Sequence, residues 1–522
     1  PRTRFEGKPS QPDEIVPQPT FTDGQMNAAP KTLGPRPPIG WATKLLHSCG
    51  AAANQIKAAS LSMLLLLFYN QVVGLDPRIV SSAILITMFV DSIVDPLVGQ
   101  FSDNFHSRLG RRHPFMYFAA LPVSVAFFLI WNPPMGMSAG STFAYMLGCL
   151  LVIRAFDTFF ELPSMALAPE LAADYDERTR LLAMRQMFGA VGTLSVSVLV
   201  YQVFMRQHAD GGGGVTERAG YFGYSICAAL LVFSIIVISS TGTLRQVPYL
   251  AKPPARQKFN PLSILSQVFQ TLRNRNFAVV AVAGMVLALS VGIQQSLNIY
   301  IGLFYWRLSQ NQLTVLAVAT VLAQFLGVWM APRMVKRFGK RIGALITGWI
   351  SICFAVSPII ADQLHLMPAR HSSELFVILV AAAFVQSGFS ISTAVKIQAM
   401  IADVVEDAAT KTGRRSEGLL FSADSLFKKA VSGVGVLMAG QLLYFINFPE
   451  NARKVGVAPE VANHLGLATV FSQLLFNGGC LIALSFYGIT REKHADNLRF
   501  LAAKNDTGGA VIQPVLEEGR LP

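Results

Sequence analysis

Two carboxylates lie inside an apolar segment near the start of the chain. Asp91 and Asp95 fall within the run ILITMFVDSIVDPLVG, residues 84–99. On a helix, residues four apart project from nearly the same face, about 6 Å apart along the axis. One Asp at a bilayer centre costs about 2.5–3.5 kcal/mol, so a lipid-facing pair would cost roughly 5–7 kcal/mol. We therefore expect both side chains to face a wet cavity or a counter-charge, either as a cation-coupling pair or as an internal ion pair that only holds helices together.

Further polar residues lie inside other apolar segments, and intramembrane ionisable residues are by default functional candidates. Arg154, Asp157, Thr158 and Glu161 recur at helical spacings of three and four and so share one side of a helix. Arg154 and Asp157 could neutralise one another there. We expect a substrate to be contacted from this helix by Arg154 and Asp157 and from other segments by Gln55, Lys57, Gln294, Gln295, Asn298, Lys396 and Lys429. Lys428 and Lys429 point about 100° apart on a helix, so we expect only one of them to face the cavity with the acids.

The composition is that of an integral membrane protein. Hydrophobic residues make up 52% of the 522 residues and charged residues 14%, and the mean hydropathy is +0.45. Segments of spanning length, about 20 residues, predict an all-α protein with twelve transmembrane helices. They lie near residues 43–74, 78–101, 114–133, 141–168, 181–205, 220–241, 276–306, 312–333, 341–361, 374–402, 417–447 and 466–489.

The formal net charge of +13 reflects topology rather than nucleic-acid binding. Basic residues gather in the tails and in alternate loops, as in residues 333–341, whereas the loop 132–141 carries no charge. This positive-inside pattern predicts that both termini are cytoplasmic. We expect the membrane to be a bacterial inner membrane. Residues 1–40 and 491–522 are polar and are expected to be cytoplasmic tails, the first disordered.

Two echoes divide the chain into similar halves. The stretch 99–114, with Asp103, Arg111 and Arg112, is echoed by 331–341, with Arg337 and Arg341. Residues 169–181 are echoed by 401–419. Such repeats predict two pseudo-symmetric six-helix bundles, at 41–242 and 276–490, joined by a cytoplasmic linker at 243–275. The basic stretches are then candidate gating loops.

Three motifs resemble those of a known family. DSIVDPLVG at 91–99, FFELPSMALAPELAADYDERTRL at 159–181 and DVVEDAATKTGRRSEGLLF at 403–421 are similar to those of the glycoside–pentoside–hexuronide:cation symporters, exemplified by the melibiose permease. This family belongs to the major facilitator superfamily, and the sodium-dependent lysophosphatidylcholine symporter of animals is related to it. The resemblance covers residues 43–490 and implies the fold with two bundles.

The same resemblance implies roles for particular residues. Asp91, Asp95, Thr158 and Glu161 map onto the family's cation site, and Arg185 and Lys429 map close to the substrate. The resemblance thus implies that Lys429, rather than Lys428, is the lysine that faces the cavity with the acids. Other positions differ from the permease: Val94 replaces an asparagine, Gln55 a sugar-binding aspartate and Met165 a tryptophan. Because Val94 offers no oxygen ligand and two neighbouring carboxylates favour protonation of one, a proton is favoured over sodium as the coupling ion, though sodium at Asp91 and Asp95 stays an alternative.

These features predict a monomeric, cation-coupled symporter of a sugar, glycoside or uronate that works by alternating access. We expect membrane lipids around it, no cofactor, and no bound metal other than that possible sodium. The first alternative is a symporter of a lysolipid or other amphiphile, which the missing tryptophan favours. An alternative from another class is a non-transporting membrane sensor. An ATP-driven pump is disfavoured because no Gly-rich phosphate loop is followed by Lys-Ser/Thr. An enzyme is disfavoured because no nucleophile and base are clustered.

Overall fold

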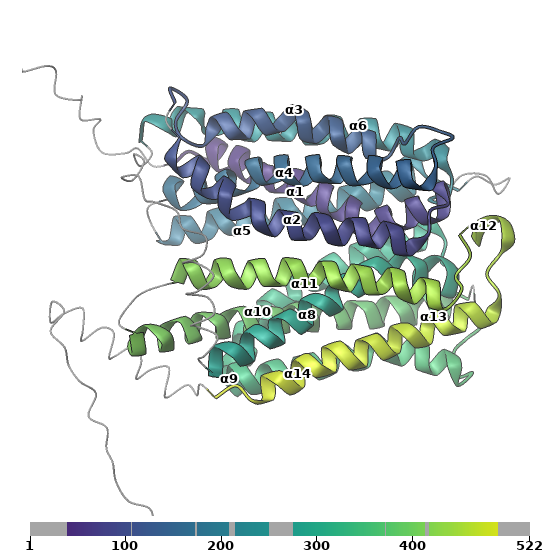
Figure 1. Ribbon diagram of the computed structural model, residues 1–522. Helices are drawn as coiled ribbons and strands as arrows, with labels where there is room; N and C mark the ends of the chain where they lie inside the picture. The colour runs from purple at the N-terminus through teal and green to yellow at the C-terminus, as the bar shows by residue number, and fades with distance from the viewer. Residues whose placement is uncertain are drawn as a thin grey trace, which may run out of the picture. The chain divides into compact units, whose positions relative to one another are not determined.

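The computed structural model consists of long helices packed side by side (Figure 1). It describes residues 39–105, 107–172, 175–207, 214–249, 275–370, 372–412, 417–450 and 452–488. No strand occurs in this part of the chain. The predicted tails and most of the predicted linker lie outside the described residues, so these three boundaries stay predictions.

The first half supplies six long helices. They are α1 (Trp41–Leu67), continued by the π-helical turn η1 (Phe68–Val73), α2 (Pro77–Asn104), α3 (His113–Ile130), α4 (Ala139–Leu171), α5 (Tyr175–Val198), continued by η2 (Leu199–Phe204), and α6 (Arg218–Thr243), continued by the 3-10 turn η3 (Leu244–Tyr249). Asp76 caps α2 by accepting a hydrogen bond from the Arg78 amide at 2.8 Å. Hydrogen bonds from the Arg78 side chain hold the pKa of Asp76 below its ordinary value.

The second half begins at Arg275. It contains α8 (Arg275–Tyr300) with η4 (Ile301–Tyr305), α9 (Gln310–Gln363), α10 (Ser373–Thr412), α11 (Glu417–Phe445), the short α12 (Ala452–Val455), and α13 (Pro459–Ser472), which continues through η5 (Gln473–Asn477) into α14 (Gly478–Ser485). Ser309 and Gln312 form a capping box that fixes the start of α9.

α9 contains two of the predicted spans, 312–333 and 341–361, in one element of 54 residues. A straight helix of that length would be about 80 Å long, far more than the roughly 30 Å hydrocarbon core of a bilayer. Gly339 interrupts the helix with φ 76° and ψ 173°, a backbone conformation that favours glycine. The described residues contain 11 helices long and apolar enough to cross a membrane, counting α9 once, so the predicted number of twelve is not confirmed as such.

The helices form two groups that follow the two halves of the sequence. α1 packs on α5 and α6, α3 on α4 and α6, and α2 on α4; in the second half α9 packs on α10, and α8 on α11 and α14. Glycines permit close backbone approach at some of these contacts. A Cβ on Gly192 would lie 2.6 Å from the Ala52 carbonyl oxygen, and one on Gly327 would lie 2.2 Å from that of Gly388. The groups meet where α2 contacts α11, α1 contacts α8 and α5 contacts α9.

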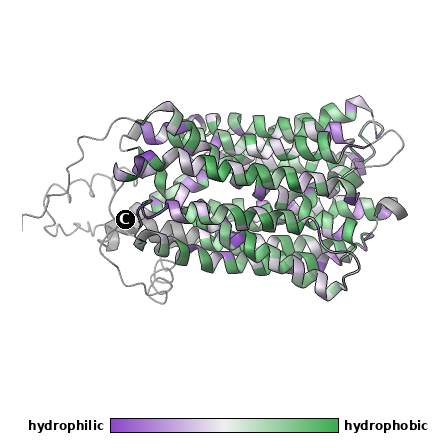
Figure 2. Cartoon of the chain, turned by 90° about the horizontal axis from the view of Figure 1, so that it is seen from above, coloured by the Kyte–Doolittle hydropathy of each residue, from purple (hydrophilic) through white to green (hydrophobic). Residues whose placement is uncertain are grey.

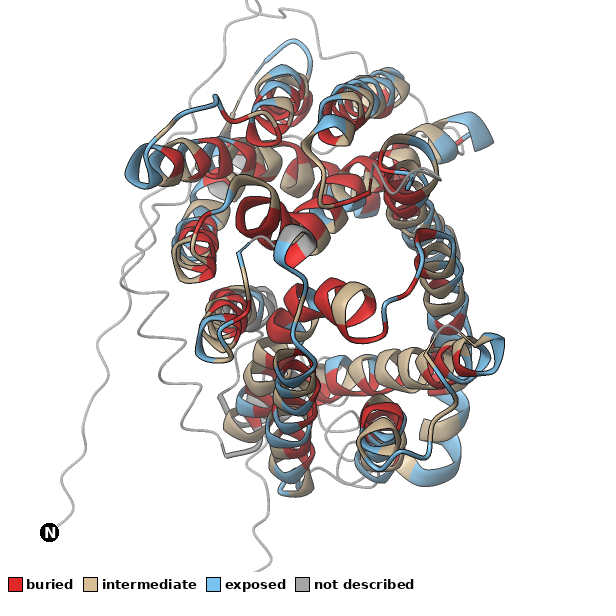
Figure 3. Ribbon diagram, turned by 90° about the vertical axis from the view of Figure 1, so that its right-hand side faces the viewer, coloured by how far each residue is buried: buried red, intermediate tan, exposed pale blue. Residues whose placement is uncertain are grey.

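The surface of this fold suits a membrane. Hydrophobic residues fill the middle of the helices and hydrophilic residues gather at the two ends (Figure 2). Seen end-on, buried residues face neighbouring helices and exposed residues face outward (Figure 3). Many of these exposed residues are large and apolar, including Leu121 at 62%, Leu230 at 62% and Phe471 at 66% exposure. The protein is therefore an integral, multi-pass membrane protein.

The packed helices have two ends, which we call the basic end and the opposite end. The basic end is the one at which α1 begins and α2 ends, and it includes Arg111, Arg112 and the bend at Gly339. The opposite end includes the α1–α2 connection at residues 74–76 and the connection between α11 and α12.

Candidate functional site

The two aspartates of α2 lie at the boundary between the halves. α2 packs between α4 of its own half and α11 of the other, so Asp91 and Asp95 meet side chains from both. Only 6% of the Asp91 side chain and 20% of the Asp95 side chain are exposed. As predicted, these carboxylates are sheltered from lipid.

A hydroxyl from α4 lies between the two acids. Thr158 Oγ1 is 3.2 Å from Asp91 Oδ1 and 2.9 Å from Asp95 Oδ1. It also lies 3.1 Å from the Arg154 carbonyl oxygen, one turn earlier in α4. A hydroxyl carries one proton, so it donates to one of these three acceptors at a time. The structure thus brings together three of the four residues predicted for the cation site.

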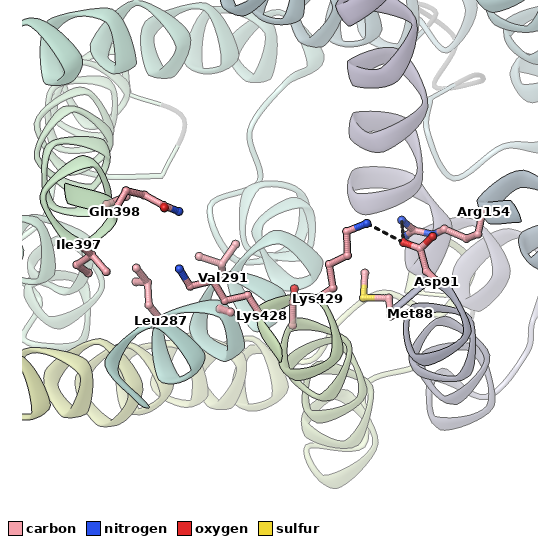
Figure 4. Close-up of a pocket in the computed structure, with 13 residues that line it drawn as sticks. Met88, Asp91, Arg154, Leu287, Val291, Ile397, Gln398, Lys428 and Lys429 are labelled. Atoms are coloured by element: carbon pink, nitrogen blue, oxygen red, sulfur yellow. Dashed lines mark hydrogen bonds and ion pairs between the residues drawn. The ribbon is translucent and has the colours of Figure 1, made fainter. Parts of the chain in front are cut away.

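Lysine and arginine supply the counter-charges. Lys429 of α11 donates to Asp91 Oδ2 at 3.3 Å and forms a closer ion pair with Asp95 (Figure 4). Arg154 of α4 lies on the other side, with Nη1 3.8 Å from Asp91 Oδ2. Two carboxylates are thus balanced by two cations, one of them from the second half of the chain. We call Asp91, Asp95, Arg154 and Lys429 the charge cluster.

A second buried ion pair lies beside the charge cluster. Lys57 of α1, whose side chain is 1% exposed, binds Asp157 of α4 and stands 5.6 Å from the Phe160 ring. The expectation that Arg154 and Asp157 neutralise one another was therefore wrong, because each binds an oppositely charged residue on another helix. Sequence spacing identified the pair as neighbours on α4 but could not show which residue of α1 or α2 packs against each.

Glu161 differs from the other acids of this region. It forms no hydrogen bond or ion pair with the described residues, although Asp157, Lys429, Lys57 and Asp95 are its charged neighbours. Arg185 of α5, predicted close to the substrate, is buried and instead lies 3.0 Å from Ser164 Oγ and 3.3 Å from His47 Nε2.

A cavity of about 340 Å³ adjoins the charge cluster. Its lining comes from α2, α4, α8, α10 and α11, and thus from both halves: Met88, Asp91, Arg154, Gly284, Leu287, Ala288, Val291, Ala394, Ile397, Gln398, Lys428, Lys429 and Ser432. Asp91, Arg154 and Lys429 meet at one side (Figure 4). Lys428 lies across the cavity from them, beside the largely apolar residues of α8 and α10. The expectation that only Lys429 faces the cavity was wrong, since Lys428 lines it too; only Lys429 reaches the acids.

Several predicted substrate residues do not line this cavity. The residues absent from its lining include Gln55 on α1 and Gln294, Gln295 and Asn298 on α8. Lys396 is fully buried between α9 and α10, where it donates to Ser392 Oγ at 2.7 Å, the Ser392 carbonyl at 3.0 Å and Thr347 Oγ1 at 3.1 Å. Their roles in substrate binding stay predictions.

The repeated basic stretches make equivalent contacts in the two halves. In the first half Arg111 and Arg112 bind Glu170 near the end of α4, with Arg112 Nη2 2.7 Å from Glu170 Oε1. In the second half Lys340 binds Asp403 of α10, which also accepts a hydrogen bond from Tyr487 at 3.2 Å. Sequence reasoning missed both acids as site residues, although each lies in the echoed segments 169–181 and 401–419.

Other gating candidates have no such partner. Arg337 and Arg341 are exposed and form no ion pair with a described residue. In this basic stretch it is Lys340 that binds an acid, Asp403. Asp103 belongs to α2, but its side chain lies outside the described part of the structure.

Neutral hydrogen bonds join the halves at the opposite end. Gln71 of η1 donates to the Pro449 carbonyl at 2.9 Å and accepts from the Ala452 amide at 2.9 Å. Tyr300 of α8 donates to Asn70 at 3.2 Å. We call these contacts, together with Gln202 to Thr314 at 2.8 Å and the Gln207 amide to Gln310 at 2.7 Å, the opposite-end seal.

α2 and α11 also approach closely within the same end. Arg78 stacks on the Tyr444 ring at 3.4 Å. A Cβ on Gly440 would lie 2.1 Å from Ser81 Oγ and 2.6 Å from the Pro77 carbonyl oxygen. Sequence reasoning missed these residues because an arginine at the end of a membrane span is common, and a tyrosine, a serine or a lone glycine gives no signal before its partner is known.

Comparison with known families decides the class of this protein. A family model described as MFS/sugar transport protein matches residues 46–491, most of the chain. The chain belongs to this family. The predicted resemblance to the glycoside–pentoside–hexuronide:cation symporters is thereby confirmed.

Sequence alignments with individual relatives cover most of the chain. The isoprimeverose transporter of Lactiplantibacillus pentosus is 23% identical over 459 residues, 87% of this chain and 90% of that protein. A putative glycoside/cation symporter of Escherichia coli (strain K12) is 24% identical over 427 residues, 82% of this chain and 87% of that protein. The sodium-dependent lysophosphatidylcholine symporter 1 of Gallus gallus is 22% identical over 509 residues, 90% and 91% of the two chains.

Solved structures share the fold. The nucleoside transporter NupG has a TM-score of 0.57 at 12% identity, covering 86% of this chain and 100% of that one. A bacterial homologue of the human lysosomal transporter Spinster has a TM-score of 0.58 at 12% identity, covering 88% and 97%. This family member therefore has the all-α major facilitator fold, as the sequence predicted.

Proposed function

We propose that the protein is a cation-coupled symporter of a sugar, glycoside or uronate that works by alternating access. One observation carries this proposal: Lys429 of the second half holds both acids of α2 in the first half, at the edge of a cavity lined by both halves. Ions and substrate that bind there contact the two parts that must move relative to one another. The names of the relatives, among them an isoprimeverose transporter and a glycoside/cation symporter, support the substrate class.

Lys429 stands in for the coupling cation in this state. Asp91 and Asp95 are balanced by Lys429 and Arg154, so a further cation can load only by displacing one of these groups. The Lys429 side chain is 37% exposed and lines the cavity, so its displaced ammonium group has room to turn toward a bound substrate. Cation loading and substrate binding then favour one another, which is what symport requires.

We propose a proton as the coupling ion. Sodium prefers several oxygen ligands, by the logic that governs calcium and magnesium. Here the cluster offers two carboxylates and the Thr158 hydroxyl, Val94 adds no oxygen, and Lys429 already occupies the space between the acids. A proton needs only one carboxylate oxygen, and its arrival at Asp95 would release Lys429. Glu161, which has no bonding partner among the described residues, is the nearby group that can complete a sodium site with water if the proposal fails.

The access route follows from the opposite-end seal. Since hydrogen bonds between the halves close that end, we propose that substrate reaches the cavity from the basic end in this state. The positive-inside pattern supports placing the basic end on the cytoplasmic side of the membrane. We propose further that this is a bacterial inner membrane and that the protein acts as a monomer. Transport then requires the seal to open while the basic end closes, for which the contacts to Glu170 and Asp403 are candidate latches.

A lysolipid is the second candidate substrate, and the cavity lining favours it. Leu287, Val291 and Ile397 lie across the cavity from the charge cluster, beside Lys428 and Gln398 (Figure 4). These apolar side chains suit a molecule with one polar and one apolar part. The chicken relative named as a lysophosphatidylcholine symporter is consistent with this alternative.

A two-step experiment tests the function. Purified protein is first screened by thermal shift against sugars, glycosides, uronates and lysolipids, since a ligand of the native state raises apparent stability. The most stabilising compound is then used for counterflow in proteoliposomes. We expect a sugar derivative to give saturable counterflow. Stabilisation by lysolipids alone would replace the sugar proposal with the second candidate, and binding without any counterflow would point to a sensor.

A further inference from the structure

One face of α9 changes from apolar to basic near Gly339. Large apolar residues that are 37–57% exposed recur on this face at helical spacing: Val315, Val318, Leu322, Leu326 and Trp329. Because this helix is long and apolar enough to cross a membrane, we assign these residues to contact with lipid acyl chains. Arg333, Lys336 and Arg337 continue the same side of the helix and are also exposed. The basic residues therefore lie where a lipid-facing surface reaches the membrane interface.

Arg333 is held against an aromatic ring. Its guanidinium carbon is 3.6 Å from the centre of the Trp329 ring, and Nη1 donates to the Trp329 carbonyl at 2.7 Å. Helical side chains lean toward the start of their helix, so the guanidinium lies about one turn, roughly 6 Å, closer to the apolar segment than its own Cα. A cation at that depth is costly unless an anion accompanies it.

The protein supplies no such anion in the described part of the chain. Arg333, Lys336 and Arg337 form no ion pair with a described residue. The neighbouring Lys340 is different, because it binds Asp403 of α10. Three positive charges without an acidic partner thus lie within about 6 Å of helix axis, beside an exposed tryptophan.

We propose that Trp329, Arg333, Lys336 and Arg337 form a binding site for the headgroup phosphate of an anionic phospholipid. A guanidinium presents paired N–H donors that match phosphate oxygens, and a nearby ammonium adds charge. Tryptophan prefers the membrane interface, where its ring packs on the glycerol and upper acyl region. The site lies on the outer surface of α9, away from the cavity, and does not depend on the transported substrate.

Quenching of Trp329 fluorescence tests this site. The full-length protein is reconstituted in phosphatidylcholine vesicles, and brominated phosphatidylglycerol or brominated phosphatidylcholine replaces part of the lipid. The Trp329 signal is the difference between wild type and W329F, since the chain has five tryptophans. We expect the anionic lipid to quench at a lower mole fraction than the zwitterionic lipid. In the double variant Arg333→Gln/Arg337→Gln, the mole fraction for half-quenching should rise on the order of tenfold.

A matched control removes two other basic residues from the same end. Arg178 and Arg180 are exposed on α5 and have no adjacent tryptophan, so Arg178→Gln/Arg180→Gln should leave the preference at Trp329 unchanged. An equal loss in both double variants would mean general surface charge and overturn the proposal, as would equal quenching of wild type by the two lipids. Competition by inorganic phosphate at millimolar concentration would show an anion site rather than a lipid site. Thermal stability in detergent without added lipid should match wild type for both variants, which separates lost binding from misfolding.

Discussion

At the scale of residues, the charge cluster owes its behaviour to the balance of two acids and two cations. Asp95 makes the closer contact with Lys429 and is more exposed than Asp91, so we expect it to be the acid on which the coupling cation loads. Asp95→Asn keeps the shape of the side chain and removes its charge. We expect gradient-driven accumulation to fall to the equilibrium level while counterflow partly survives.

The comparison of these two assays makes the Asp95 prediction specific. A variant that is misfolded loses both activities, whereas one that is uncoupled loses only accumulation. Normal accumulation by Asp95→Asn would show that this carboxylate does not couple the ion to the substrate.

Lys428 and Lys429 form a natural pair of variants. Both line the cavity, but only Lys429 contacts the acids of α2. A hydrogen bond to a charged group contributes about 1.5–3 kcal/mol, so Lys429→Ala should lower kcat/KM for uptake by roughly 10–100-fold. Lys428→Ala should act mainly on KM. Loss of transport only at Lys428 would contradict the assignment.

The ion pair of Lys57 and Asp157 should matter more for stability than for coupling. Lys57 is 1% exposed, and removing one partner of a buried pair typically costs about 3–5 kcal/mol. Asp157→Leu should therefore lower Tm strongly. In the double variant Lys57→Met/Asp157→Leu no charge is left unpaired, and we expect most of that Tm to return. If Lys57→Met/Asp157→Leu is no more stable than Asp157→Leu, the two side chains contribute more to stability than the neutralisation of each other's charge.

At the scale of elements, the sequence was most informative where apolar length and charge decide the outcome. The α3 and α6 bounds differ from the predicted spans by only a few residues. α10 runs ten residues beyond its predicted end at 402, to Thr412. The predicted span ends where the apolar run meets Asp403, whereas the helix continues through the more polar residues that follow. Apolar length thus locates a membrane segment but not the end of a helix that projects from the membrane.

The candidate site could be predicted in part for a related reason. Two acids one turn apart in an apolar helix are costly by themselves, so Asp91 and Asp95 were recognisable without knowledge of their partners. Which cation serves which acid depends on helix packing, and the pairing of Asp157 with Lys57 could not be read from spacing on α4 alone. The residues of the opposite-end seal carry no charge and so gave no signal.

Close packing of α2 on α11 gives a prediction about conformation. A side chain at Gly440 would overlap Ser81 and the Pro77 carbonyl, so Gly440→Leu should destabilise the state in which the opposite end is closed. Gly148→Leu is the matched control, because nothing lies within 4 Å of a Cβ there. Both are made with Ser432→Cys, which places a thiol in the cavity, in a chain without its five native cysteines.

Labelling from each side of the membrane reports the outcome. With a membrane-impermeant thiol reagent, the control should react from the side of the basic end. Gly440→Leu should react faster from the opposite side, by several-fold or more. Identical side preference in the two variants would show that this contact does not hold the opposite end closed.

At the scale of the whole molecule, two of the contacts between the described halves differ in their chemistry. Neutral hydrogen bonds join them at the opposite end, and the charge cluster joins them beside the cavity. Neutral bonds can exchange with water at modest net free energy, which suits a contact that opens in every cycle. The charge cluster responds to ion loading, which suits the contact that decides when opening occurs.

The central claim is that a proton loading on the charge cluster drives substrate accumulation. The most direct measurement is uptake of the stabilising substrate into sodium-free proteoliposomes under an imposed pH gradient, for wild type and Asp95→Asn. We predict that wild type concentrates the substrate and that the variant only equilibrates it. No accumulation by wild type under the pH gradient, with strong accumulation once a sodium gradient is imposed at constant pH, would contradict the account and identify sodium as the coupling ion.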